Sequence, residues 1–243
     1  MESYTLITGA TSGIGLELVK RLSVSRKLFL VGRNEEKLKS ALDICSYKEN
    51  HLTFLCDLNA ERETLFDKLN NFIVEKGITI DIFVHCAGTI KILPVKRFPI
   101  DDIDSIFNTN VFSAIEIIKV LLRKGNHAAL KNIVFISALW SIRGEAANSI
   151  YSASKGALNS LTGSLAKELA PKVRVNSILP GGVYTPMAQK SMNSELGQVL
   201  KKDYPLGYGT TDDVVNMIEF LISDKSKWMT GQKICLDGGR SIY

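Results

Sequence analysis

Two residues of reactive type stand four positions apart in the stretch NSIYSASKG, residues 148–156. They are Tyr151 and Lys155. Side chains four apart on a helix lie on the same face, so the phenol and the ammonium are predicted to meet over one patch. A neighbouring positive charge favours the phenolate and lowers the pKa of a tyrosine from its usual value of about 10. The spacing predicts an acid/base tyrosine with a lysine beside it; two ordinary helix-surface residues are the alternative for the pair taken alone.

The elements that must position this pair alternate along the whole chain. Short apolar runs, from YTLIT at the start to KICLDGG near the end, are separated by helical patterns. Strands that are apolar on successive residues, with helices between them, are typical of a parallel sheet covered on both faces. The sequence predicts a doubly wound α/β fold of the Rossmann type with three α/β/α layers, in a single domain over residues 1–243. The irregular segment 185–213 follows the sixth strand, and we expect it to form a substrate lid, with a plain surface excursion as the alternative.

Composition and charge exclude several classes of protein. The chain is 45% hydrophobic and 23% charged, which excludes a disordered or collagen-like chain. Its net charge of +5 is spread without a basic block, so we expect no nucleic-acid partner. We also expect a cytoplasmic protein without a membrane partner, since no secretory signal or long apolar run is visible. The irregularly spaced cysteines and scattered histidines predict neither a disulfide framework nor a metal site.

A glycine-rich turn follows the first predicted strand in TLITGATSGIG. Glycines there let the backbone approach a pyrophosphate, whose charge the N–H groups at the helix start would meet. The spacing G-x-x-x-G-x-G is a variant of the dinucleotide fingerprint in its required position. A glycine-rich turn that binds nothing is the alternative. We expect the turn to bind a dinucleotide through Gly9, Thr11, Ser12, Gly13, Ile14 and Gly15.

The end of the second predicted strand indicates which dinucleotide is bound. Proteins selective for NAD place a carboxylate there, whereas those selective for NADP use an arginine near the 2′-phosphate. In VGRNEEK, Gly32 stands where the acid is expected and Arg33 follows it. A guanidinium is a planar and permanently charged partner for a phosphate. We therefore expect NADP(H), bound through Arg33; an arginine paired with Glu35 or Glu36 on the surface is the alternative.

Several motifs now occur in a fixed order: TGATSGIG, CDL, AG, Asn110 in NTNVFSA, Y-x-x-x-K, PGG and LDGG. The whole chain resembles the short-chain dehydrogenase/reductase family. The resemblance implies an oxidoreductase that moves a hydride between NADP(H) and a small-molecule carbonyl or secondary alcohol, with Tyr151 as general acid/base. It implies that Lys155 binds the nicotinamide ribose and that Asn110 holds a water connecting the lysine to solvent. Further cofactor contacts are implied for Asp57 and Leu58 at the adenine, Ala87 and Gly88 at the ribose, and Pro180, Gly181, Val183 and Thr185 at the nicotinamide.

The chain departs from the family pattern thirteen residues before the tyrosine, where Ala138 stands in place of a serine. In the family that serine is a second hydrogen-bond donor to the substrate oxygen. Ser137 would need a bulge to replace it, because adjacent strand side chains face opposite ways, and Ser141 on the following loop is another candidate. Losing one such donor costs about 10²- to 10³-fold in rate. The alternative function is therefore an NADP(H)-binding sensor or interaction module with weak or lost catalysis.

Three further features of the sequence carry predictions. His85 stands before AG, where the family more often has asparagine, and we expect a core residue bonded to backbone. Tyr208 stands where the family commonly has an arginine. The helical segments around residues 101–123 and 148–170 carry more small and apolar side chains than one sheet face requires. We therefore expect a homo-oligomer, either a dimer or a homotetramer.

Overall fold

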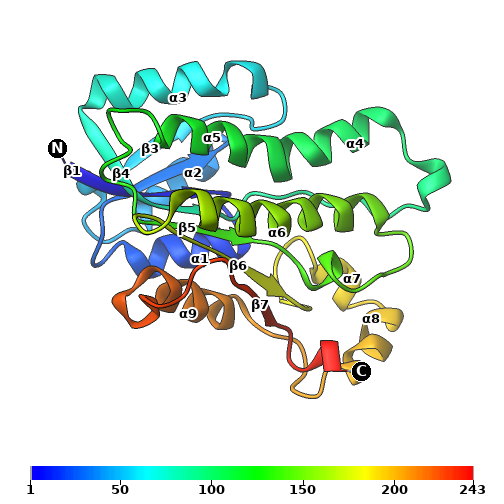
Figure 1. Cartoon of the computed structure of the whole chain (residues 1–243). Coiled ribbons are helices and arrows are strands. Elements are labelled where there is room, and N and C mark those ends of the chain that lie inside the picture. The colour runs from blue at the N-terminus through cyan, green and yellow to red at the C-terminus, as the bar shows by residue number, and fades with distance from the viewer. Residues whose placement is uncertain (1, 243) are drawn as a thin grey trace.

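A single sheet of seven parallel strands forms the centre of the computed structural model, which describes residues 2–242. The strands are β1 (Glu2–Thr8), β2 (Leu28–Gly32), β3 (Leu52–Leu55), β4 (Ile78–His85), β5 (Asn132–Ile136), β6 (Arg174–Pro180) and β7 (Lys233–Leu236). Their order in the sheet is β3-β2-β1-β4-β5-β6-β7 (Figure 1). The strands thus follow one another from β1 to the edge strand β3, and from β4 to the opposite edge strand β7. This order confirms the doubly wound α/β fold.

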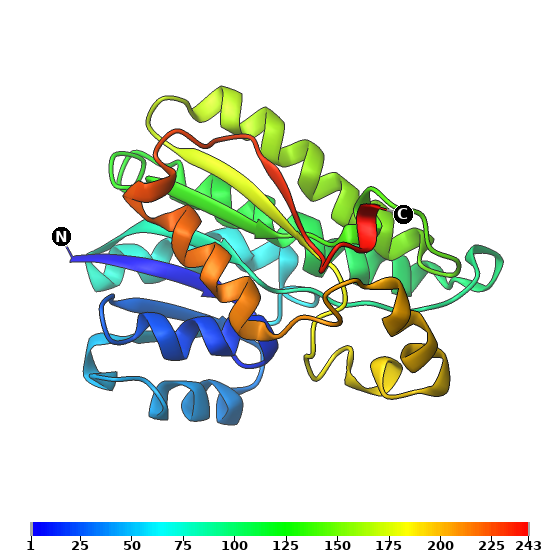
Figure 2. The ribbon, with the colours of Figure 1, turned by 90° about the horizontal axis from the view of Figure 1, so that it is seen from below.

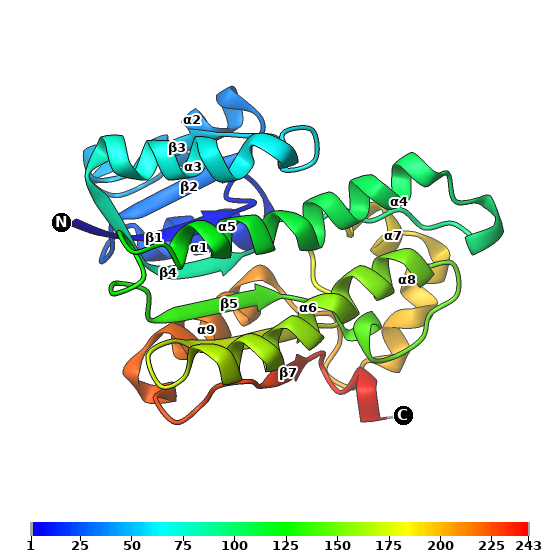
Figure 3. The same ribbon diagram turned by 45° about the horizontal axis from the view of Figure 1, so that its top comes forward.

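Helices cover both faces of this sheet, giving three layers (Figure 1). One face carries α3 (Arg62–Lys76), α5 (Ser113–Leu121) and α6 (Ser149–Leu169), and the other carries α1 (Gly13–Leu22), α2 (Glu35–Asp43) and α9 (Thr211–Ile222). The helix α4 (Ile100–Phe107) leads into α5 through a π-helical turn, Asn108–Phe112. Figure 3 shows α4 and α5 running in line beside α6.

The five inner strands, β1, β2, β4, β5 and β6, are buried on both sides, as their continuous apolar pattern predicts, whereas the edge strands β3 and β7 carry exposed residues. Leu6 and Ile7 of β1 are adjacent and both fully buried, but they belong to different clusters. Because adjacent strand side chains point to opposite faces, each face needs its own helical cover. Leu6 packs in the cluster under α3, α5 and α6, and Ile7 in the cluster under α1, α2 and α9.

The segment between β6 and α9 lies beyond the carboxyl ends of the strands (Figure 2). It contains two short helices, α7 (Gln189–Met192) and α8 (Glu195–Leu200). Doubly wound proteins bind ligands at this edge of the sheet, near the switch point between the two halves. The segment is therefore placed where it can border a binding site.

Among residues 2–242, no helix has the length and apolar character needed to cross a membrane. Within the same range, no three side chains of histidine, cysteine, aspartate or glutamate come together as a metal site would require. Each of the four cysteines is a free thiol.

Candidate active site

A cavity of about 450 Å³ opens at the carboxyl ends of the strands. The β1–α1 turn, the ends of β4, β5 and β6, and the start of α6 form its walls together with the 185–213 segment. The structure brings most of the predicted site residues to this cavity. They are Gly9, Ser12, Gly13, Ile14, Gly15, Ala87, Gly88, Tyr151, Lys155, Pro180, Gly181, Val183 and Thr185. The glycine turn and the tyrosine helix, distant in the sequence, therefore share one site.

The glycine turn is shaped by close backbone approaches. Gly9 has a φ of +64°, and a Cβ there would lie 2.8 Å from the backbone nitrogen of Ala87. A Cβ on Gly15 would lie 2.2 Å from the carbonyl oxygen of Gly9. Ser12 begins α1 without a side-chain cap, which leaves the N–H groups of the first helical turn for another acceptor. The N–H groups at the start of α1 are uncapped, and only glycine leaves the space through which a ligand can approach them. Such groups suit the pyrophosphate of a dinucleotide.

The end of β2 carries no carboxylate and packs closely on this turn. A Cβ on Gly32 would lie 3.0 Å from Cγ2 of Thr11. Arg33, the next residue, is exposed and does not line the cavity. The ion pairs found among residues 2–242 do not include Arg33, so the surface pairing with Glu35 or Glu36 is absent there. Its guanidinium is left available for an anion at this strand end.

Asp57 and Leu58, predicted at the adenine, follow β3 outside the cavity lining. The Asp57 carboxylate accepts hydrogen bonds from the backbone N–H groups of Asn59 (2.9 Å) and Ala60 (3.2 Å). It therefore stabilises its own turn. Leu58 is buried in the core on the α3 side of the sheet.

Tyr151 and Lys155 lie near the start of α6. The lysine Nζ is 5.9 Å from the centroid of the tyrosine ring and donates a hydrogen bond to the Ile136 carbonyl oxygen at 2.8 Å. Burial lowers the pKa of Lys155 to about 8 and raises the pKa of Tyr151 to about 12. The shift is opposite to the predicted lowering of the tyrosine pKa, because burial disfavours the charged phenolate. Tyr151 is an acid that keeps its proton at neutral pH.

Asn110 lies outside the cavity lining but stands directly behind it, in the π-helical turn. It is fully buried; its Nδ2 donates to the Thr89 carbonyl oxygen and to Ser154 Oγ, both at 3.0 Å. Its Oδ1 accepts from the Thr89 N–H at 2.8 Å. A Cβ on Gly88 would lie 3.2 Å from Lys155 Nζ and 3.5 Å from Asn110 Oδ1. Asn110 thus ties the loop after β4 to α6, and π-helical turns are frequent at functional sites.

His85 connects this turn to β1 through a short chain of hydrogen bonds. The Ala87 N–H donates to Thr8 Oγ1 at 3.2 Å, and Thr8 Oγ1 lies 2.9 Å from His85 Nδ1. With the threonine hydroxyl donating to Nδ1, His85 Nε2–H donates to the Asn110 carbonyl oxygen at 3.2 Å. Burial lowers the pKa of His85 to about 3, so the ring is neutral. The prediction of a core histidine bonded to backbone is confirmed.

Ala138 lines the cavity, and neither neighbouring serine replaces the missing hydroxyl. Ser137 Oγ donates to the Lys155 carbonyl oxygen at 2.9 Å. Ser141 Oγ donates to the Ala138 carbonyl oxygen at 2.5 Å and accepts from Asn159 Nδ2 at 2.6 Å. Both hydroxyl protons are committed to backbone oxygens, so the structure offers neither serine as a donor to a substrate.

Many cavity residues were not predicted, because they come from loops without a sequence motif. The 185–213 segment contributes Met187, Ala188, Ser191, Met192, Gly197, Leu200, Tyr204 and Tyr208 in addition to Thr185. Tyr208, the departure from the family arginine, packs against Gly182: a Cβ there would lie 2.6 Å from Cδ1 of the ring. Trp140 and Asn148, on either side of the loop that leads into α6, also line the cavity.

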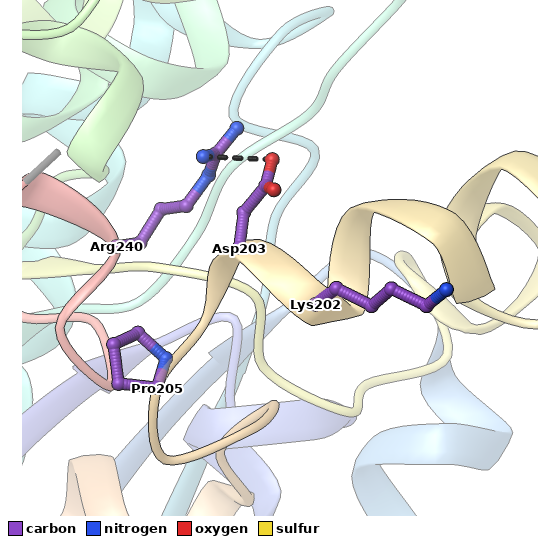
Figure 4. A pocket seen from close by; sticks show the side chains of 4 residues that line it. All are labelled: Lys202, Asp203, Pro205 and Arg240. Atoms are coloured by element: carbon purple, nitrogen blue, oxygen red, sulfur yellow. Dashed lines mark ion pairs between the residues drawn. The ribbon is translucent and has the colours of Figure 1, made fainter.

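A smaller pocket of about 320 Å³ lies beside the cavity and is lined by Lys202, Asp203, Pro205 and Arg240 (Figure 4). Arg240 forms an ion pair with Asp203 at 2.8 Å, the pair drawn in Figure 4, and also lines the main cavity. Its guanidinium therefore joins the C-terminal end of the chain to the 185–213 segment.

Known proteins match almost the whole chain. The family model described as Enoyl-(Acyl carrier protein) reductase matches residues 9–241. The chain belongs to the short-chain dehydrogenase/reductase family. As a member, it is an oxidoreductase that depends on a pyridine nucleotide.

Two relatives of this short-chain dehydrogenase/reductase show how far the match extends. A tropinone reductase homolog of Arabidopsis thaliana is 31% identical over 243 residues, covering 98% of this chain and 90% of its own length. The 3-oxoacyl-[acyl-carrier-protein] reductase FabG of Rickettsia felis is 31% identical over 238 residues, covering 97% of this chain and 95% of its own.

Solved structures agree with the fold and differ in cofactor. The structure of ElxO with NADP bound has a TM-score of 0.86 and 26% identity, covering all of both chains. A 4-hydroxyisoleucine dehydrogenase mutant complexed with NADH and succinate has a TM-score of 0.91 and 25% identity, covering 99% of each chain. The neighbours thus support a nicotinamide cofactor without deciding between NADP and NAD.

Proposed function

We propose that this chain reduces a carbonyl compound with NADPH, with Tyr151 as the proton donor. The observation that carries the proposal is the meeting, in one cavity, of a glycine turn fit for a pyrophosphate and a protonated tyrosine. When bound, the nicotinamide supplies a hydride to the carbonyl carbon. The substrate oxygen then gathers negative charge, and Tyr151 transfers its proton to that oxygen. With a pKa of about 12, the phenol carries at neutral pH the proton that this transfer requires.

Lys155 and Asn110 support this step from behind the tyrosine. With a pKa of about 8, Lys155 is mostly charged at neutral pH. One of its three N–H donors is used on the Ile136 carbonyl oxygen, which leaves two for the ribose hydroxyls of the cofactor. Asn110 fixes the loop carrying Gly88 against the lysine. From the family resemblance, we also propose that Asn110 holds a water that connects Lys155 to solvent.

We propose NADP(H) as the cofactor because the end of β2 carries a glycine in place of an acidic residue and is followed by an arginine. Gly32 offers no carboxylate to the ribose, and Arg33 is exposed without an ion-pair partner among residues 2–242. A guanidinium beside a 2′-phosphate favours NADP over NAD. We also propose that Asp57 and Leu58 border the adenine, although both lie outside the cavity.

The cavity walls indicate the kind of substrate. Ile90, Ile92, Trp140 and Met187 are large apolar side chains in the cavity lining. We propose that the 185–213 segment acts as a lid and that the substrate is a small-molecule ketone or 3-oxo ester with an apolar body. The FabG relatives, named 3-oxoacyl-[acyl-carrier-protein] reductases, support the 3-oxo class.

The experiment for this proposal separates cofactor binding from turnover. Fluorescence titration with NADPH and with NADH measures binding, and loss of NADPH absorbance over a panel of ketones measures reduction. We expect tighter binding of NADPH and turnover of at least one 3-oxo ester. Normal NADPH binding without any turnover would favour the second candidate, a cofactor-binding sensor or interaction module, which the alanine at position 138 motivates.

Three broader properties are also proposed. The family resemblance supports a homo-oligomer, a dimer or tetramer, although the large apolar side chains of α5 and α6 are packed in the core of the chain and none is exposed among residues 2–242. Light scattering that finds only a 26.8 kDa species would contradict the oligomer. We also propose a cytoplasmic location and no nucleic-acid partner.

A further inference from the structure

We propose that the side-chain amide of Asn148 donates the hydrogen bond to the substrate oxygen that a serine gives in other family members. The inference rests on the proposed reduction of a carbonyl compound. It assigns the second donor of the site to a residue that no sequence motif marks.

The position of Asn148 places it on the reactive face of α6. It is the residue that caps the N-terminus of this helix, three positions before Tyr151 and seven before Lys155. Residues at this spacing lie along one helical face. All three side chains line the same cavity.

The bonding of Asn148 leaves its amide for a ligand. The residue is only 6% exposed, yet among residues 2–242 neither its fully buried Oδ1 nor its Nδ2, the donor of the amide, has a hydrogen-bond partner. Asparagine at this position of a helix usually accepts a bond from the first helical turn, but this side chain forms none. Buried polar side chains are normally paired, so an unpaired amide bordering a cavity points to a partner that enters the cavity.

Three other hydroxyl groups at or near the cavity have fixed partners. Ser137 and Ser141 donate to backbone oxygens, as described above. The Tyr208 hydroxyl donates to the Gly197 carbonyl oxygen at 2.5 Å. Glu145 lines the cavity but offers a carboxylate, which accepts hydrogen bonds and does not donate them when ionised.

The test compares Asn148→Ala and Asn148→Asp with a matched control, Ser152→Ala. Aspartate keeps the shape of asparagine, caps helices well and cannot donate when ionised. Ser152 Oγ is also buried without a partner on α6, but the residue does not line the cavity. Ethyl acetoacetate and trifluoroacetophenone serve as probes, with NADPH binding and thermal unfolding measured for every variant.

We expect both substitutions at position 148 to lower kcat by about 100-fold, with NADPH affinity changed less than about twofold. Ser152→Ala should turn over like wild type. Adding Ala138→Ser to the Asn148→Ala variant should restore roughly tenfold of the lost rate, and the same change should gain much less in the wild-type chain, because the two donors serve one oxygen.

Four outcomes would overturn the inference. Turnover of Asn148→Ala at the wild-type rate would show that the amide is not used. A loss without rescue by Ala138→Ser, accompanied by a lower unfolding temperature, would assign Asn148 a structural role. An equal loss in Ser152→Ala would show that the helix start, and not the amide, matters. A wild-type chain that reduces neither probe would remove the proposed reduction and this inference together, a result visible before any variant is made.

Discussion

The two sides of the cavity are built by different means. On the cofactor side, the walls are backbone brought close by missing side chains: a Cβ on Gly9 or Gly15 would lie within 2.8 Å of main-chain atoms. On the substrate side, the walls are side chains such as Trp140, Met187 and Tyr204, supplied by loops and short helices. A wall made of glycine backbone tolerates no added atom, whereas a wall of side chains can change without disturbing the fold. We therefore expect this chain to share its cofactor chemistry with its relatives and to differ in substrate.

The largest effect expected from a change to the walls of the cavity is on the cofactor side. In Gly15→Ala the added methyl meets the Gly9 carbonyl oxygen, where a Cβ would lie 2.2 Å away, so the turn must shift. We expect NADPH affinity to fall about 100-fold. Gly163→Ala on α6 is the control: among residues 2–242, no atom other than the neighbouring backbone of its own helix lies within 4 Å of its Cβ position, and alanine should stabilise the helix by about 0.5 to 1 kcal/mol. Fluorescence titration and urea unfolding measure both; normal NADPH binding by Gly15→Ala would contradict the backbone account.

Replacing Arg33 tests the side chain that we propose selects NADPH over NADH. Its guanidinium should form a charged hydrogen bond with the 2′-phosphate, so Arg33→Ala should weaken NADPH binding by roughly 10- to 100-fold and leave NADH binding unchanged. Lys227→Ala removes an exposed cation before β7, at the opposite end of the sheet, and should alter neither. Equal losses for both cofactors in Arg33→Ala would assign the arginine a general electrostatic role.

The pH profile tests the lysine on the boundary between the two sides. Burial lowers the pKa of Lys155 to about 8, so raising the pH removes its proton well before that of Tyr151, whose pKa is raised to about 12. We expect kcat/KM for NADPH to be flat near neutral pH and to fall about tenfold per pH unit above about pH 8. A profile that stays flat to about pH 10 would mean that the charge on Lys155 is not needed.

His85 gives the smallest effect, on stability. Its pKa falls from 6.5 to about 3 on folding, so between these values the unfolded chain binds a proton that the folded chain excludes. The free energy of unfolding should therefore decrease as the pH is lowered from about 6.5, by about 1.4 kcal/mol per pH unit from this residue. In His85→Asn this contribution should disappear, as urea unfolding at two pH values would show. An identical pH dependence in the variant would contradict the buried neutral histidine.

The sequence predicted the parts of the molecule that depend on pattern and backbone. Continuous apolar strands indicated the sheet covered on both faces, and glycine spacing located the turn that meets α6 at the cavity. It did not predict the direction of the Tyr151 pKa shift, because that depends on how much water the folded chain excludes. Nor did it settle the replacement for the serine missing at Ala138: the hydroxyl protons of Ser137 and Ser141 are committed to backbone oxygens that only the fold brings near.

Binding and turnover of Tyr151→Phe, compared with wild type, test the central claim most directly. The substitution removes the hydroxyl from a cavity that otherwise keeps its shape. The account predicts that NADPH binds with unchanged affinity and that kcat for the best ketone falls by about 10²- to 10⁴-fold. A variant that still reduces the ketone at a rate close to that of wild type would contradict it.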